Sequence, residues 1–297
     1  NRLRPHLSNS FQTRCKVLFM NERPEEVSPI SAAESLLPID EHIEEGHDAE
    51  GRKVRHRGIY LLPNLFTTAN LFAGFFSIIS AVNGKFEIAA ITVFVAMVLD
   101  SLDGRVARLT NTQSAFGAEY DSLSDMVAFG VAPALLAYEW ALSGLGNVGL
   151  TVAFIYVACA ALRLARFNTQ IGKVDKRYFI GLASPAAAVV VAGTVWAVWA
   201  FGEKSGVSGD DLPIFVVMLY ALLVAAAGLL MVSNFKYNSF KDLDLKGRVP
   251  FVAILAVVLV FAVVFSDPPR ILLLIFLAYA VSGPLQYLLR LRRTRSV

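Results

Sequence analysis

Residues 86–125 read FEIAAITVFVAMVLDSLDGRVARLTNTQSAFGAEYDSLSD. The apolar run over 88–99 leads directly into a stretch in which charged residues recur. A short polar connection at 110–114 separates two helical patterns, so we expect two antiparallel helices. Ionisable residues inside an apolar span are costly and therefore indicate functional positions. The acidic residues of this stretch after the apolar run are Asp100, Asp103, Glu119, Asp121 and Asp125.

The composition places the chain in the membrane class. Of its 297 residues, 56% are hydrophobic and 17% charged, whereas soluble domains have about 45–50% apolar and about 25% charged residues. A chain of this length cannot bury so much apolar surface in a water-facing fold. Two cysteines, Cys15 and Cys159, are too few for a disulfide framework. All four histidines precede residue 57, which excludes a histidine-based catalytic or zinc site in the apolar region.

The apolar runs after residue 58 predict an all-α integral membrane protein with about eight transmembrane helices. Each run has roughly 18–25 residues, which is enough to cross a bilayer. Glycines and one Pro-Pro pair mark the connections between the runs. The predicted spans are 64–82, 86–109, 115–142, 148–168, 180–201, 212–233, 249–266 and 269–290.

The charge pattern predicts the domains and the orientation. Residues 1–58 form a polar, largely disordered leader, 59–290 the transmembrane domain and 291–297 a basic tail. With eight spans, one set of connections and ends carries nineteen Lys and Arg residues, and the opposite set carries only three. The positive-inside rule therefore places both termini, the leader and the tail in the cytoplasm.

Four aspartates fall on facing stripes of the second and third predicted spans. Asp100 and Asp103 are three residues apart, and Asp121 and Asp125 are four apart, so each pair shares a helix face. Four carboxylates cannot stay ionised and unpaired in a low dielectric, and oxygen ligands favour hard cations. We expect two Mg²⁺ or Mn²⁺ ions, with Ca²⁺ as a substitute or inhibitor, in the two-metal arrangement of phosphoryl transfer. The alternatives are structural Asp–Arg pairs and the ion site of a cation-coupled transporter.

The same residues belong to a longer pattern. D-x2-D-G-x2-A-R-x8-G-x3-D-x3-D is matched in full over 100–125, and it resembles the signature of the CDP-alcohol phosphotransferase family. Members of that family are membrane enzymes that transfer a phosphatidyl-type group from a CDP-linked lipid to an alcohol and release CMP. The metal ligands that the resemblance implies are Asp100, Asp103, Asp121 and Asp125, of which Asp125 is also the general base. The implied CDP-binding positions are Gly104, Ala107, Arg108 and Gly117, and Asn64 and Thr67 are added as candidate contacts to phosphate oxygens.

Other segments resemble the bacterial and archaeal phosphatidylserine synthases within that family. They are PNLFT at 63–67, ALRLARFN at 161–168, FIGLASPAAA at 179–188, MVS at 231–233 and YNSFK at 237–241. The resemblance implies transfer of a phosphatidyl group from CDP-diacylglycerol to the hydroxyl of L-serine. Arg163 and Arg166 are candidates to bind the serine carboxylate, with Asn168 and Ser184 in the same acceptor or phosphate-binding region. Glycerol phosphate, inositol phosphate and choline stay open as alternative acceptors.

These interpretations define the expected partners and location. The partners are CDP-diacylglycerol, L-serine, membrane lipids and a second copy of the chain in a homodimer, with no nucleic acid. The location is the inner, cytoplasmic membrane of a bacterial-type cell. The active site faces the cytoplasm, because the basic connections lie on that side.

Overall fold

The computed structural model describes residues 46–47, 53–54, 61–109, 115–170, 178–205, 212–238 and 251–295, and the chain divides into the units 1–55 and 56–297. In the first unit, β1 (Gly46–His47) pairs antiparallel with β2 (Lys53–Val54). Most of the predicted leader, residues 1–58, lies outside the described residues.

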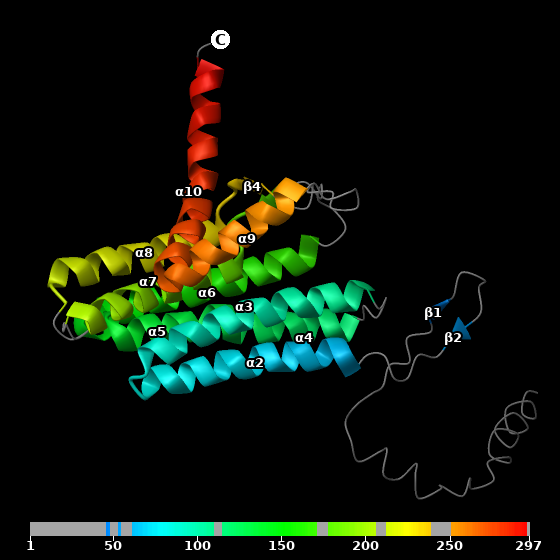
Figure 1. Cartoon of the computed structure of the whole chain (residues 1–297), viewed down its shortest axis with the longest axis horizontal. Coiled ribbons are helices and arrows are strands. Elements are labelled where there is room, and N and C mark those ends of the chain that lie inside the picture. The colour runs from blue at the N-terminus through cyan, green and yellow to red at the C-terminus, as the bar shows by residue number, and fades with distance from the viewer. Residues whose placement is uncertain are drawn as a thin grey trace, which may run out of the picture. The chain divides into compact units, whose positions relative to one another are not determined.

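The described part of the second unit is almost entirely helical, as Figure 1 shows. The helices are α2 (Leu61–Val82), α3 (Phe86–Leu109), α4 (Ala115–Asp125), η1 (Met126–Val131), α5 (Ala132–Trp140), η2 (Leu142–Leu145), α6 (Asn147–Gln170), α7 (Ser184–Ser205), α8 (Ile214–Val232), α9 (Phe251–Ser266) and α10 (Pro268–Arg295). With α4, η1 and α5 taken as one continuous segment, these helices lie within or close to the eight predicted ranges. Two short strands, β3 (Tyr178–Ile180) and β4 (Lys236–Asn238), pair antiparallel.

Five of the described helices are long and apolar enough to cross a membrane, namely α2, α6, α7, α8 and α10. The three remaining predicted spans are not long or apolar enough in the structure, each for an identifiable reason. α3 carries charged residues along its second half, the α4–η1–α5 segment is divided, and α9 has only 16 residues. The prediction of a helical integral membrane protein is thus confirmed, and the number of spans stays a prediction.

Small residues let the helices approach one another closely. Ala89, Ala90 and Ala128 are fully buried. At Gly74 of α2, a Cβ atom would lie only 2.7 Å from the Cα atom of Ala128 in η1, so this contact requires glycine. Close packing of this kind is common between membrane helices, where apolar burial gives no driving force for association. Large apolar side chains such as Phe72 point outward instead, as expected for contact with lipid.

The segment that follows Asp125 is a π-helical turn inside a longer helix. η1 spans six residues, and the N–H group of Ala132 donates to the carbonyl oxygen of Val127, five residues earlier. Such wide turns occur mostly as single insertions in α-helices, frequently near functional sites. Here the wide turn separates the aspartates of α4 from the part of α5 that packs against α2, α6 and α7.

The last helix runs in a different direction from the bundle. In Figure 1, α10 stands at a steep angle to the helices α2–α8 and rises away from them. It packs against α7, α9 and β4. The helix continues to Arg295, so the predicted basic tail, 291–297, is helical over most of its length.

Candidate active site

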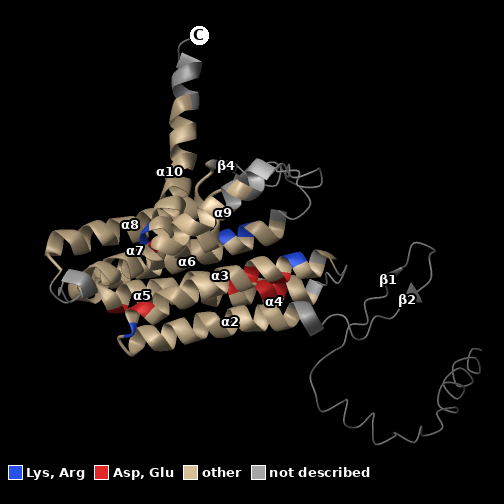
Figure 2. Cartoon of the chain, viewed as in Figure 1, with Lys and Arg blue, Asp and Glu red and all other residues tan. Residues whose placement is uncertain are grey.

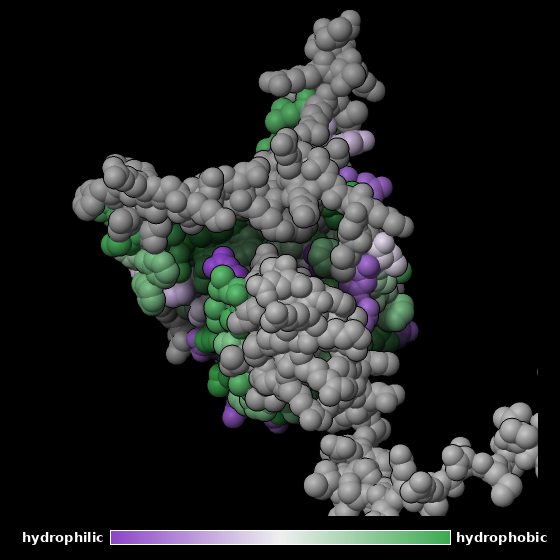
Figure 3. Space-filling view, turned by 90° about the vertical axis from the view of Figure 1, so that its right-hand side faces the viewer, coloured by the Kyte–Doolittle hydropathy of each residue, from purple (hydrophilic) through white to green (hydrophobic). Residues whose placement is uncertain are grey.

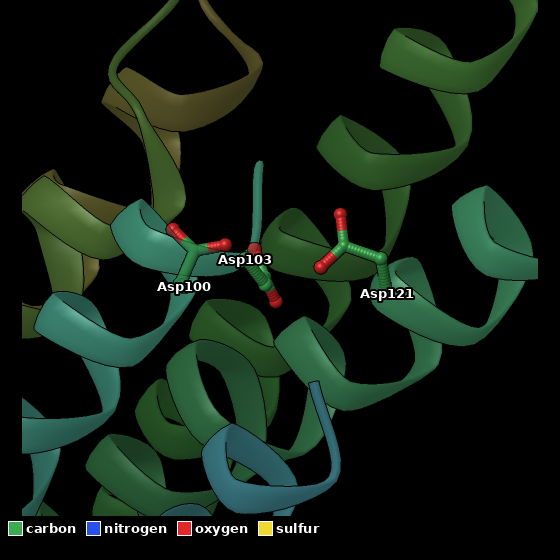
Figure 4. Close-up of side chains that lie close together, drawn as sticks. All are labelled: Asp100, Asp103 and Asp121. Atoms are coloured by element: carbon green, nitrogen blue, oxygen red, sulfur yellow. The ribbon is translucent and has the colours of Figure 1, made fainter. Parts of the chain in front are cut away.

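Three carboxylates converge where α3 and α4 meet. One oxygen atom from each of Asp100, Asp103 and Asp121 lies within 4.8 Å of the other two. Figure 4 shows Asp100 and Asp103 on α3 and Asp121 on the neighbouring helix, with their carboxylates directed into a common space. The short connection between the two helices, 110–114, makes this arrangement possible, because it brings the end of α3 next to the start of α4. Asp103 is only 5% exposed.

Asp125 is the fourth aspartate of the pattern, and it lies beside this group rather than within it. The side chain is buried and sits next to Asp100. Its Oδ1 atom accepts a hydrogen bond of 3.1 Å from the Nδ2 atom of Asn70 on α2. The structure thus brings the four predicted carboxylates together, with three in one group and Asp125 beside them, bonded to the amide of Asn70.

Helix α2 ties the two aspartate-bearing helices together. Thr67 is buried, and its hydroxyl donates to the Oδ2 atom of Asp103 at 3.1 Å. The hydroxyl of Ser124 on α4 donates to the backbone oxygen of Thr67 at 3.0 Å. Thr67, a candidate contact to the CDP phosphates in the sequence analysis, therefore lies directly beside the three converging aspartates. Asn64 lies partly exposed, one turn earlier on the same helix.

The predicted acceptor residues lie in three different environments. Arg163 on α6 donates from Nη1 to the hydroxyl oxygen of the buried Ser184 at 2.6 Å, and it interacts electrostatically with Asp125 and Asp100. Arg166 is directed elsewhere, to Asn234 at 3.5 Å. Asn168 exchanges hydrogen bonds with Ser122 on α4, at 3.0 and 3.2 Å. Arg163 and Ser184 thus lie next to the aspartates, and Arg166 does not share their contacts.

The predicted CDP-binding positions flank the carboxylates on the same two helices. Gly104 is exposed, and Ala107 and Gly117 are half-buried. The side chain of Arg108 lies outside the described residues. Charged residues of α3, α4 and α6 gather toward one end of the bundle in Figure 2. Figure 3 views the bundle from that end and shows hydrophilic residues set between hydrophobic ones.

Several residues that contact the site escaped sequence reasoning. Asn70 is fully buried against Asp125, and Ser122 and Ser124 bond to Asn168 and to the backbone of α2. A signal for Asn70 exists, because it is a polar residue inside an apolar span and lies three positions after Thr67, on the same face. The serines lie between two aspartates of the pattern and give no comparable signal.

The residues present fit a divalent cation. The Oδ1 atom of Asp121 is buried and has no hydrogen-bond partner among the described residues, and buried polar atoms are rarely left unpaired. It belongs to the group of three converging carboxylates. A donor set made only of oxygen atoms favours Mg²⁺, Mn²⁺ or Ca²⁺ over softer metals. Asp100, Asp103 and Asp121 could therefore hold a hard cation.

Comparison with known proteins agrees with this site. The profile of the CDP-alcohol phosphatidyltransferase family matches residues 60–231, which include α2 to α8 with both aspartate-bearing helices. The chain belongs to this family.

Three curated relatives show which members of the family the chain resembles. A CDP-diacylglycerol–serine O-phosphatidyltransferase of Helicobacter pylori is 39% identical over 77% of this chain and 92% of its own length. An enzyme of the same name from Methanocaldococcus jannaschii is 34% identical over 78% of this chain and 96% of its own length. One from Mycobacterium tuberculosis is 39% identical over 59% of this chain and 63% of its own length.

Proposed function

We propose that this family member transfers the phosphatidyl group of CDP-diacylglycerol to the hydroxyl of L-serine, giving phosphatidylserine and CMP. The observation that carries the proposal is the position of Arg163. It is a cation on α6, hydrogen-bonded to Ser184, and it interacts with Asp125 and Asp100 of the aspartate cluster. The names of the relatives from H. pylori and M. jannaschii support serine as the acceptor.

The aspartates have two tasks in this proposal. Asp100, Asp103, Asp121 and Asp125 hold two divalent cations, Mg²⁺ or Mn²⁺. When bound, these cations neutralise the carboxylates and the negative charge that develops on the departing CMP. Thr67 fixes the Asp103 carboxylate through its hydrogen bond of 3.1 Å. Gly104, Ala107 and Gly117, which carry little or no side chain, leave room for the cytidine, and we assign Asn64 and Arg108 to contacts with the diphosphate.

Asp125 acts as the general base. It takes the proton from the serine hydroxyl as the oxygen forms a bond to the phosphorus that carries the lipid, and the bond from phosphorus to the CMP oxygen breaks. Base and hydroxyl must come within about 2.6–3.2 Å for this transfer. The amide of Asn70 supports the role, because a donor on Oδ1 stabilises the carboxylate form that takes up the proton.

Arg163 provides the contact for the acceptor carboxylate. A guanidinium group can bind a carboxylate through two parallel hydrogen bonds, and Arg163 is close enough to Asp125 to interact with it electrostatically. Serine bound in this way would present its hydroxyl toward Asp125. Ser184 holds the guanidinium in position from the first residue of α7.

The location of the enzyme follows from the charge pattern of the sequence. We propose eight transmembrane segments, cytoplasmic termini and an active site open to the cytoplasm of a bacterial-type cell, where the basic connections lie. The chain would act as a homodimer in the inner membrane, with the acyl chains of its substrate in contact with the surrounding lipid.

The test is an acceptor panel with the purified chain in detergent. CDP-diacylglycerol labelled in its phosphatidyl group is supplied with Mg²⁺ or Mn²⁺ and with serine, glycerol 3-phosphate, inositol phosphate or choline. We expect labelled phosphatidylserine and stoichiometric CMP with serine alone, and loss of both after chelation with EDTA. Transfer to another alcohol would contradict the serine assignment, and full activity in EDTA would contradict the role of the metals.

A further inference from the structure

The residue Tyr237 connects a loop strand to the last helix. It lies on β4 and is fully buried, and its hydroxyl donates to the carbonyl oxygen of Ala280 on α10 at 3.0 Å. Its ring lies over Gly283, one turn further along α10. A Cβ atom at Gly283 would come within 2.7 Å of the ring atom Cε1 and closer still to Cζ, so the ring occupies a space that only glycine leaves open.

The same strand is fixed to the segment that leads into α7. β4 pairs with β3, with Phe179 opposite Tyr237. The N–H group of Gly181 then donates to the carbonyl oxygen of Phe235 at 2.9 Å. Gly181 has a φ of +81° and packs directly against the carbonyl oxygen of Met231, so no side chain would fit there. Three residues later comes Ser184, the partner of Arg163.

Tyr237 also contacts a residue of α10 that faces the proposed acceptor site. The rings of Tyr237 and Tyr279 have centroids 5.4 Å apart, and Tyr279 interacts electrostatically with Arg163. Arg163 therefore has Ser184 of α7 and Tyr279 of α10 as neighbours. Tyr279 belongs to α10, which β4 contacts through Tyr237. Ser184 is the first residue of α7, which follows β3, the strand that pairs with β4.

We propose that Tyr237 is a positioning residue, which sets the affinity for the acceptor by holding α10 and the start of α7 in place around Arg163. The inference rests on the proposed function, in which Arg163 binds the acceptor carboxylate. Neither Tyr237 nor Gly283 contacts the aspartates in any interaction that the structure describes, so CDP-diacylglycerol binding should depend on them much less than serine binding does.

The test is a double-mutant cycle with Gly283→Ala and Tyr237→Ala. Steady-state CMP release is measured at varied serine and, separately, at varied CDP-diacylglycerol. A displacement of about an ångström at a binding group can be costly, so each single variant should raise the serine KM roughly tenfold. The KM for CDP-diacylglycerol should stay within twofold of the wild-type value. The double variant should match Tyr237→Ala alone, because no ring remains for the new methyl group to displace.

Two further variants keep the result interpretable. Gly144→Ala in η2 is the control for the glycine-to-alanine change, because nothing lies within 4 Å of the Cβ atom that it would add. It should leave both KM values unchanged. Tyr237→Phe keeps the ring and removes only the bond to Ala280, and it should raise the serine KM by a smaller factor. It decides the matter if Gly283→Ala or Tyr237→Ala fails to fold, as judged by gel filtration and thermal unfolding.

Three outcomes would overturn the inference. The first is a serine KM within twofold of wild type in Tyr237→Phe and in each of Gly283→Ala and Tyr237→Ala that folds. The second is an equal rise in both KM values, which would show a general structural role. The third is additive effects in the cycle. Absence of CMP release from serine by the wild-type chain is a different result, because it would overturn the proposed function and this inference with it.

Discussion

Asn70 of α2 donates a hydrogen bond from its side-chain amide to Asp125 of α4, across 3.1 Å and 55 residues of sequence. Both side chains are buried. A carboxylate accepts hydrogen bonds only, so the amide must turn its NH₂ group toward Asp125, and its own oxygen is left without a partner among the described residues. The pair fixes which oxygen of Asp125 is bonded to α2.

Replacing Asn70 should therefore reduce turnover. Asn70→Leu removes the donor with little change in volume, and a hydrogen bond to a charged group is worth about 1.5–3 kcal/mol. We expect kcat to fall roughly ten- to a hundredfold, at about 1.4 kcal/mol per decade, with a small change in the serine KM. Ser77→Ala is the control, because Ser77 is equally buried on α2 but bonds to the backbone of Ala89. Wild-type kcat in Asn70→Leu would exclude the role of the amide.

Asp100→Asn and Asp121→Asn should each abolish activity in a protein that still inserts and folds. Both carboxylates belong to the converging group, and an amide replaces a charged oxygen ligand by a neutral one. Mn²⁺ binding to purified protein gives a readout independent of catalysis, and it should weaken in both variants. Full activity of either variant at ordinary Mg²⁺ or Mn²⁺ concentrations would refute the two-metal proposal.

The two arginines should differ, although the sequence treats them alike. Arg163 interacts with Asp125, whereas Arg166 is directed to Asn234. Arg163→Ala should raise the serine KM roughly ten- to a hundredfold, from a charge-assisted contact of about 1.5–3 kcal/mol. Arg166→Ala should change it less than threefold. The measurement is CMP release at varied serine, and equal effects of the two variants would argue against this assignment.

Asp125→Asn provides a contrast with Arg163→Ala. If Asp125 is the base, the asparagine variant should lose kcat while its serine KM stays near the wild-type value, because the acceptor contact at Arg163 is intact. Single-turnover experiments with saturating serine measure this directly. A variant that keeps its turnover and loses only serine affinity would place Asp125 in binding rather than in proton transfer.

Reporter fusions test the orientation. A reporter inserted after residue 206 should lie outside the cytoplasm and one after residue 242 inside, because basic residues are concentrated on the second side. Alkaline phosphatase and a fluorescent protein respond to opposite sides, so together they give a positive signal at each site. The reverse result at both positions would overturn the eight-span assignment.

The aspartate motif shows what sequence could predict. The spacing of Asp100, Asp103 and Asp121 on two helices joined by a short connection was enough to expect their convergence, because helical periodicity fixes which residues share a face. The roles of these residues remain proposals. Tyr279 was missed because it approaches Arg163 from α10, and a contact between helices distant in the sequence depends on packing that no local pattern encodes. Asn70 stands out as a polar residue inside an apolar span, but its partner Asp125 on α4 could not be predicted in the same way.

The same limit explains the two arginines, but it does not apply to the membrane spans. Arg163 and Arg166 are three residues apart, and only the packing of α7 and of the loop after α8 separates their partners. Apolar runs located the helices well, because span length is a property of the local sequence. α3 is not among the five helices apolar enough to cross a membrane, because it carries Asp100 and Asp103.

The wide turn η1 gives its helix one extra residue without changing which faces α4 and α5 present to their neighbours. A π turn takes in one residue more than an α turn, so loss of one residue within Met126–Val131 would restore ordinary α-helix and leave Asp125 and α5 in their present relation. Gain of one residue would instead have to rotate α5 by roughly 100° against the aspartates, or move the contact between Gly74 and Ala128. The segment next to the proposed base should therefore accept a shorter chain and reject a longer one.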